Sequence, residues 1–330
     1  MLTKRQNFLE TIRGGNPDRF VKQFEPFALL FGGPVARAGG MPMRGETVKN
    51  AWGVTIQFPE HVPGPFPLHD EEHKVVKDAA AWRDVVKAPK VDYPDEDWAD
   101  IRDMAAAIDR NDQFATILFA PGVFEQVHYL MGMEDCLASF YTEPEAIKEL
   151  INYIADYEIA YSEQLIKHVR PDAVLHHDDW GSQISSFMSP EMFAEFLVPA
   201  YKRIYGFLKA NGVEIIVHHS DSYAANLVPH MIEIGIDVFQ GCLTSNNVPE
   251  LIKKYGGQIS FMGDINNGVV DIQGWTPELI EKEVERACRT CGKHYFIPCL
   301  ATGGPGSVYE GVYQAVSEAI DKTSKLMFPL

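Results

Sequence analysis

The chain has 330 residues, 46% of them hydrophobic and 23% charged, which are the proportions of an ordinary soluble globular protein. It carries 29 Lys and Arg against 46 Asp and Glu, and the net charge of −17 argues against the basic surface expected of a nucleic-acid-binding protein. No apolar run approaches the roughly 18 residues of a membrane span, and the first residues lack a secretory hydrophobic segment, so we expect a cytoplasmic protein.

Short β-rich runs alternate with helical segments along the chain. The first 15 residues form an amphipathic helical pattern, and later segments at 143–169 and 189–212 carry apolar residues at helical spacing. The β-rich runs lie at 21–30, 114–122, 172–180, 213–221, 236–241, 258–265 and 294–304. Alternation of strands and helices over this length predicts a parallel sheet covered by helices.

The number of runs favours a closed barrel. Seven strands are evident and an eighth is expected within 50–78, and eight strands would close a (β/α)8 barrel. An open doubly wound sheet is the alternative, but no Gly-x-Gly-x-x-Gly motif follows any strand, which argues against a dinucleotide-binding fold. We therefore predict an α/β fold: a single (β/α)8 TIM-barrel domain over 1–330, with an N-terminal helix and an excursion at 31–80 over the barrel mouth.

Polar side chains mark most of the β-rich runs. In a (β/α)8 barrel the carboxyl ends of the strands meet at one rim, and the active site lies there. A single histidine or aspartate at a strand end is more often a hydrogen-bonded structural residue, but repetition on successive strands predicts a shared active site. The residues concerned are Glu25, His177, Asp178, Asp179, His219, Asp221, Gln240, Asp264 and Cys299.

Three of these residues form a candidate metal site. His219 and Asp221 lie two positions apart, so in an extended segment their side chains share one side. Cys299 would join them from a later strand. Histidine, carboxylate and thiolate are zinc ligands, and three protein ligands leave the fourth position open, as in catalytic zinc sites. We therefore predict that His219, Asp221 and Cys299 bind Zn²⁺.

Several motifs resemble those of a known family. They are "RQNFLETIRGGNPDRFV" near the start, Trp52-Gly53, "DDWGSQISSFMSPEMFAEFLVPAYKRI" at 178–204, "IIVHHSD" and "GGPGSVYEGV". Through them the chain resembles the uroporphyrinogen decarboxylase superfamily, and more closely its corrinoid-dependent methyltransferase branch. The resemblance covers nearly the whole length and implies a (β/α)8 barrel.

The chain departs from the decarboxylases of this superfamily. Those enzymes are expected to bind the carboxylates of a porphyrinogen through an Arg-rich motif, but here the corresponding region reads "FEPFALLFGGPVARAGG" and only Arg37 is nearby. A tetrapyrrole with eight carboxylates needs several cations around the mouth. The sequence therefore argues against porphyrinogen decarboxylation.

The zinc motif of the methyltransferase branch also differs. The resemblance implies a His-x-Cys pair and a later Cys, whereas this chain has Asp221 after His219 and a match to the later position at Cys299. Aspartate makes the site harder than cysteine, which suits an oxygen substrate better than a thiol. Complete loss of the zinc is the alternative.

The resemblance implies methyl transfer from a methoxylated, aromatic small molecule to the cobalt of a corrinoid carried by a partner protein. Zn²⁺ would act as the Lewis acid at the ether oxygen, or a carboxyl or imidazole group would donate a proton to it. Catalytic roles are expected for His177, Asp178, Asp179 and His219, and substrate-orienting roles for Glu25, Gln240 and Asp264.

Two other functions stay open. A methylcorrinoid-to-thiol or tetrahydrofolate methyltransferase would share the fold and the site. A non-catalytic binding barrel is disfavoured by the imidazoles and carboxylates at the strand ends. The sequence names neither the methyl donor nor the direction of transfer, and it leaves the oligomeric state open, a homodimer included.

Overall fold

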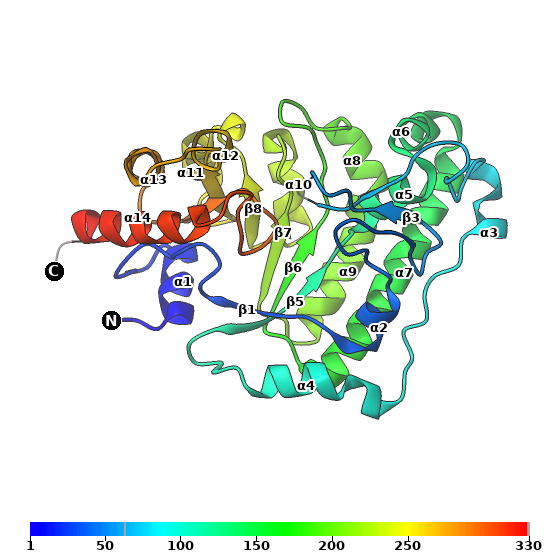
Figure 1. The fold of residues 1–330 in the computed structure, drawn as a ribbon, viewed down its shortest axis with the longest axis horizontal. Helices are drawn as coiled ribbons and strands as arrows, with labels where there is room; N and C mark the ends of the chain where they lie inside the picture. Colours follow the sequence, from blue (N-terminus) through cyan, green and yellow to red (C-terminus); the bar gives the residue numbers. More distant parts are fainter. Residues whose placement is uncertain (63, 329–330) are drawn as a thin grey trace.

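Seven parallel strands form the centre of the molecule in the computed structural model, which describes residues 1–62 and 64–328 (Figure 1). Each strand pairs with the next one along the chain, so the order in the sheet is the order in the sequence. The α/β barrel architecture is therefore confirmed, and every predicted run contains a strand. The strands are β1 (Phe27–Leu30), β5 (Phe114–Phe119), β6 (Ala173–His177), β7 (Ile215–His219), β8 (Val238–Cys242), β9 (Ser260–Ile265) and β10 (Phe296–Leu300).

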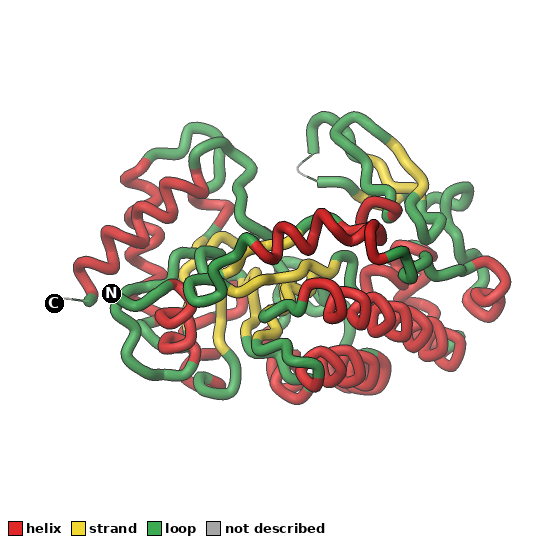
Figure 2. Tube along the Cα trace, turned by 90° about the horizontal axis from the view of Figure 1, so that it is seen from below, coloured by secondary structure: helices red, strands yellow, loops and turns green. Residues whose placement is uncertain are grey.

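Helices lie outside the strands (Figure 2). The predicted helix at 143–169 is confirmed, whereas the one at 189–212 is divided in two. Pro199 follows the break and has no N–H to donate to the carbonyl of Glu195, so the first helix cannot continue. The α-helices are α1 (Lys4–Ile12), α2 (Gly33–Ala38), α3 (Trp82–Val85), α4 (Ala99–Ala106), α5 (Val123–Met131), α6 (Met133–Thr142), α7 (Pro144–Val169), α8 (Pro190–Phe196), α9 (Val198–Ala210), α10 (Val228–Glu233), α11 (Val248–Tyr255), α12 (Asn267–Val270), α13 (Pro277–Cys291) and α14 (Val312–Met327).

The prediction of an eighth barrel strand within 50–78 is wrong. Strands β2 (Thr47–Lys49), β3 (Thr55–Gln57) and β4 (Phe66–Pro67) form a separate antiparallel sheet instead. They are too short for a barrel wall, and a proline cannot donate to a strand ladder. The segment packs against α7, where the ring of Trp52 lies 4.9 Å from that of Tyr157.

The side chain of Gln23 bonds to the backbone of β10, where an eighth strand would otherwise pair with it. The N–H of Leu300 donates to Oε1 of Gln23 at 3.3 Å. The amide nitrogen of Gln23 donates in turn to the carbonyl of Tyr313, at the start of α14. The chain before β1 therefore reaches β10 through a glutamine side chain, and among the described residues no regular strand joins β10 to β1.

Inward-facing residues form an apolar core inside the sheet, and polar side chains follow where this core ends. Leu175, Val217 and Val238 belong to it. Side chains alternate along a strand, so the next inward positions are two residues further on, at His177, His219 and Gln240. The strand register puts His177 opposite His219 and His219 opposite Gln240. Three polar side chains therefore lie side by side where the apolar core ends.

Within the described part of the chain, none of the helices combines the length and the apolar character that crossing a membrane requires.

Candidate active site

Three metal-ligand side chains converge at the carboxyl ends of β6 and β7. A ring nitrogen of His177, a carboxylate oxygen of Asp179 and a ring nitrogen of His219 all lie within 4.8 Å of one another. The two imidazole rings are 4.3 Å apart, and Oδ1 of Asp179 lies 3.8 Å from Nε2 of His219. The backbone N–H of Asp221 donates to the same Oδ1 at 3.0 Å. Over residues 1–62 and 64–328, this triad is the one group of three such side chains gathered so closely.

Hydrogen bonds behind the triad orient both imidazoles. The amide nitrogen of Gln240 donates to the carbonyl of Thr302 at 3.0 Å, so its Oε1 is left to accept from Nδ1 of His219 at 2.5 Å. Nδ1 of His177 donates to Oε2 of Glu125 at 2.9 Å. Each histidine thus uses Nδ1 for support and presents Nε2 to the site, which is the arrangement of metal-ligating histidines.

Gly303 keeps the space beside both imidazoles free. A Cβ at this position would lie 3.2 Å from Nε2 of His177 and 3.2 Å from Nε2 of His219. It would also lie 2.8 Å from Cδ2 of His177, closer than real Cβ atoms approach. Any side chain at 303 would therefore occupy the space next to Nε2 of both histidines.

The surrounding charges make the site suited to a cation. Burial alone would lower the pKa of His177, but the carboxylates of Glu125, Asp179 and Asp221 raise it to about 9. Burial, and then the charge of His177, lowers the pKa of His219 well below its usual range, which keeps this imidazole neutral. Burial and the neighbouring Asp179 raise the pKa of Asp221 to about 7. A bound metal ion would replace the proton that His177 otherwise holds.

The raised pKa of His177 predicts a pH-dependent stability in metal-free protein. The folded pKa lies above the unfolded value near 6.5, so the stabilisation is fully present below pH about 6.5 and is lost as the pH rises through about 9. We expect the Tm of the wild type in chelator to fall more steeply between pH 7 and pH 9 than that of His177→Gln, by about 2 °C or more. Parallel Tm curves for the two proteins would show that His177 is not charged in the folded state.

Asp178 faces away from the triad and holds the framework behind it. Its carboxylate accepts from the N–H of Phe124 at 3.0 Å, the N–H of Glu125 at 2.7 Å, Nε1 of Trp180 at 2.9 Å and the hydroxyl of Tyr201. The first two donors belong to the first turn of α5, so Asp178 caps this helix. The cap positions Glu125 and, through it, His177. This geometry argues against the predicted catalytic role of Asp178 and indicates a positioning role.

Removing this cap should destabilise the fold. We expect Asp178→Ala to lower the free energy of unfolding by about 3 kcal/mol, because it leaves several buried donors without an acceptor. Asp179→Ala is the matched control. Its carboxylate accepts one backbone N–H, so its loss should cost about 1 kcal/mol. Denaturant unfolding of both variants tests the assignment, and equal losses would contradict it.

Two predicted substrate-orienting residues lie away from the triad. Glu25 precedes β1, at the opposite end of the strand from the rim, where its Oε1 accepts from the N–H of Lys22 at 3.0 Å. Asp264 turns toward the outer helix α13 and pairs with Nη1 of Arg286 at 3.0 Å. It also accepts from Sγ of Cys291 at 3.4 Å. These contacts place both side chains away from the triad: Glu25 accepts a hydrogen bond in the turn before β1, and Asp264 links β9 to α13. Gln240 does lie at the site, where it supports His219.

The three predicted zinc ligands do not all lie together in the structure. Cys299 is fully buried in the inner apolar core beside Ile297, and burial raises the pKa of its thiol well above the usual range. Asp221 lies next to the triad but meets it through its backbone N–H. Of the predicted ligands, His219 alone belongs to the cluster, and His177 and Asp179 take the other two places.

Glu125 and Gly303 are not among the residues for which the sequence predicts a catalytic, substrate-orienting or metal-binding role. Glu125 follows the β5 run in the printed sequence, so its position near the rim was visible, but its bond to His177 depends on the direction of α5. Gly303 follows β10 in a glycine pair. That pair signals a turn and does not reveal which side chains the backbone approaches.

Comparisons with known proteins agree with this architecture. The model of the family Uroporphyrinogen decarboxylase (URO-D) matches residues 46–323. A methyltransferase from Methanosarcina mazei is similar in fold, with a TM-score of 0.64 and 14% sequence identity over 98% of this chain and 99% of that chain. A B12-independent methionine synthase from Shewanella sp. W3-18-1 gives a TM-score of 0.48 and 14% identity over 73% of this chain and 68% of that chain. No curated protein sequence matches the chain.

The family match covers most of the chain, from the small antiparallel sheet to the last helix, and includes every residue of the triad and its supports. At 14% identity, the likeness to the solved structures shows the fold alone. The family expected from the sequence motifs is thereby confirmed: the chain belongs to the uroporphyrinogen decarboxylase family.

Proposed function

We propose that this protein is a methyltransferase that moves a methyl group from a methoxylated, aromatic small molecule to the cobalt of a corrinoid held by a partner protein. The observation that carries the proposal is the triad of His177, Asp179 and His219 beside the space that Gly303 leaves free. The family supports it, as does the fold shared along both full chains with a methyltransferase from Methanosarcina mazei.

The triad fits a zinc ion. Two imidazoles and a carboxylate are zinc ligands, and three of them leave a position open to substrate. Both imidazoles have the outer hydrogen bonds that such ligands need, to Gln240 and Glu125. Without a thiolate the donor set is hard, which suits an oxygen substrate. Zn²⁺ bound there would supply Lewis acidity at the ether oxygen as the C–O bond breaks.

His177 offers a second way to assist the leaving oxygen. The carboxylates around it overcome the effect of burial and raise its pKa to about 9, so in metal-free protein the imidazole is protonated at neutral pH. Its Nδ1 is held by Glu125, and its Nε2–H is therefore the group that can donate to the oxygen of the departing phenolate. The same Nε2 cannot hold a proton and a metal together, so the two routes exclude each other.

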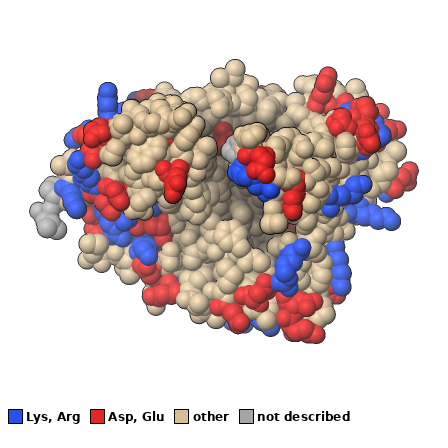
Figure 3. Space-filling view, viewed as in Figure 1, with Lys and Arg blue, Asp and Glu red and all other residues tan. Residues whose placement is uncertain are grey.

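The rim of the barrel suits a partner that carries a large flat cofactor. Exposed apolar side chains follow the carboxyl ends of three strands: Phe31 after β1, Ile184 after β6 and Val308 after β10. The face drawn in Figure 3 is hollowed near its centre; uncharged atoms border the hollow on the left and below, and acidic and basic side chains border it on the right. A corrinoid protein docked over the site would cover these three side chains, because each follows a strand end at the same rim.

A methyl-transfer assay tests the proposal. The purified, zinc-loaded chain is mixed with a cobalt(I) corrinoid protein and a set of aryl methyl ethers, and methylcobalt is followed by its absorption spectrum. We expect methylcobalt and the free phenol in equal amounts. Absence of methylcobalt with every ether rejects the proposal. Transfer from a methylcorrinoid to a thiol or to tetrahydrofolate, measured in parallel, would assign the chain to the other half of such a pathway.

A further inference from the structure

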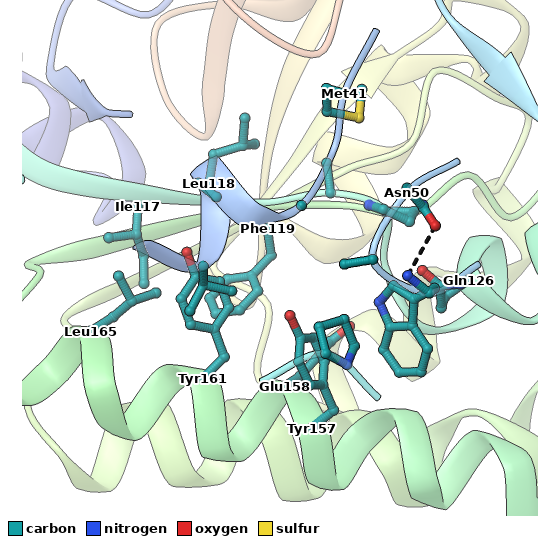
Figure 4. A pocket seen from close by; sticks show the side chains of 18 of the residues that line it. Met41, Asn50, Ile117, Leu118, Phe119, Gln126, Tyr157, Glu158, Tyr161 and Leu165 are labelled. Carbon is teal, nitrogen blue, oxygen red and sulfur yellow. Dashed lines mark hydrogen bonds between the residues drawn. The ribbon is translucent and has the colours of Figure 1, made fainter. Parts of the chain in front are cut away.

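A cavity lies beside the outer face of the sheet. Its volume is about 350 Å³, within the range of small-molecule pockets. The end of β1, α2, β5 and α7 enclose it, together with the segment around Trp52, and no residue of the triad lines it (Figure 4). The proposed function does not use this cavity.

Aromatic rings form much of its wall. Trp52 meets Tyr157 edge-on with ring centres 4.9 Å apart, and Tyr161 meets Phe119 in the same way at 5.3 Å. Tyr157 and Tyr161 lie one helical turn apart on α7, with ring centres 6.3 Å from each other. The four rings form a continuous aromatic wall contributed by three separate parts of the chain.

The charge in the wall is negative. Glu158 is the one charged residue that lines the cavity in the described part of the chain, and no Lys, Arg or His joins it. Its side chain is buried, with Oε2 accepting from Nε2 of His176 at 2.9 Å while Oε1 has no hydrogen-bond partner. A carboxylate in such surroundings acts strongly on a nearby charge, because the local dielectric is low.

A donor without a partner lines the same cavity. Gln126 is 2% exposed, and its Nε2 makes no hydrogen bond to the protein. Buried polar groups are satisfied in most proteins, and exceptions require an explanation. An unpaired donor and an unpaired carboxylate oxygen beside an aromatic wall indicate a ligand that carries both a hydrogen-bond acceptor and a positive charge.

We propose that this cavity binds a small alkylated ammonium compound that also carries an oxygen acceptor. The faces of Trp52, Tyr157 and Tyr161 attract the cation, as in aromatic cages for quaternary ammonium groups. Glu158 balances its charge, and Nε2 of Gln126 donates to its oxygen. An anionic ligand would face the carboxylate with no cation in the wall to offset it.

Calorimetry with choline and 3,3-dimethylbutan-1-ol tests the proposal on the native protein. The two molecules have nearly the same shape, but the second is neutral. We expect choline to bind at least about tenfold more tightly, the preference that cation–π contacts and a buried carboxylate provide. Equal affinities, or no binding of choline, would overturn the proposal. The readout is the heat of binding, so failure of the proposed methyl transfer would leave it untouched.

Two substitutions on α7 locate the site. Glu158→Gln keeps the shape of the side chain and should weaken choline at least about tenfold while leaving the alcohol unchanged. Glu163→Gln is the matched control, because Glu163 lies on the same helix and is exposed. Its binding of choline should equal that of the wild type. Loss in both variants, or in neither, would contradict binding in the cavity.

Discussion

Replacing His219 with alanine should lower methyl transfer by about 1,000-fold and abolish stoichiometric zinc binding. The loss of the imidazole leaves two ligands in the triad, too few to hold a zinc ion firmly. Lewis acidity at a breaking bond is worth several kcal/mol, and each 1.4 kcal/mol corresponds to about a factor of ten in rate. Metal content after equilibrium dialysis and the rate of methylcobalt formation are the two measurements.

Two further variants test whether the expected loss is specific to His219 and its support. Gln240→Leu removes the acceptor that holds Nδ1 of His219, and we expect it to reduce zinc affinity and rate by about 10- to 100-fold. His294→Ala removes an exposed histidine that bonds to the carbonyl of Gly15, and it should have no effect on either quantity. Normal transfer and normal zinc content in His219→Ala would rule out the triad as the reacting centre.

The barrel was predictable because its strands are buried on both faces. Such strands appear in a sequence as continuous apolar runs, as at Ile215–Val217, and the helices between them begin and end at recognisable residues. Ser189 does accept from the N–H of Met192 at the start of α8. The eighth strand was not predictable, since its place beside β10 is taken by the side chain of Gln23.

The adjacent histidines at the ends of β6 and β7 show how much of the site the alternation of side chains along a strand can predict. His176 and His218 stand beside the site residues in sequence but point outward, to Glu158 and to the hydroxyl of Tyr205. Alternation predicts that one histidine of each pair points inward. It does not say which one until the register is known, and the register comes from the whole sheet.

Cys299 failed as a predicted ligand for a related reason. The ladder that runs through His219 and Gln240 continues to Met262 and then to Ile297. Cys299 is paired with Asp264, two residues beyond Met262, and its side chain packs into the apolar core. The spacing of residues along a strand predicts which side chains point into the barrel. It does not predict how far each side chain lies from the rim, because that depends on the stagger between neighbouring strands.

Gly303→Ala should lower the rate of methyl transfer about 100-fold with little effect on the fold. The added Cβ would lie 2.8 Å from Cδ2 of His177, so the ring has to move. It would also lie 3.2 Å from Nε2 of both histidines, in the space that a metal or substrate atom needs. A displacement of about 1 Å at a reacting centre costs on the order of 100-fold in rate. We expect that loss in methyl transfer and a comparable loss in zinc affinity.

Gly304→Ala is the matched control, because a Cβ at 304 meets no atom within 4 Å. Both substitutions have the same effect on the backbone entropy of the unfolded chain, and both lie in the turn after β10. A difference between them therefore reports on the space beside the imidazoles and not on the flexibility of the loop. Full activity in both variants would show that this space stays unused during the reaction. Zinc retained by Gly303→Ala with activity lost would place the substrate, and not the metal, against Gly303.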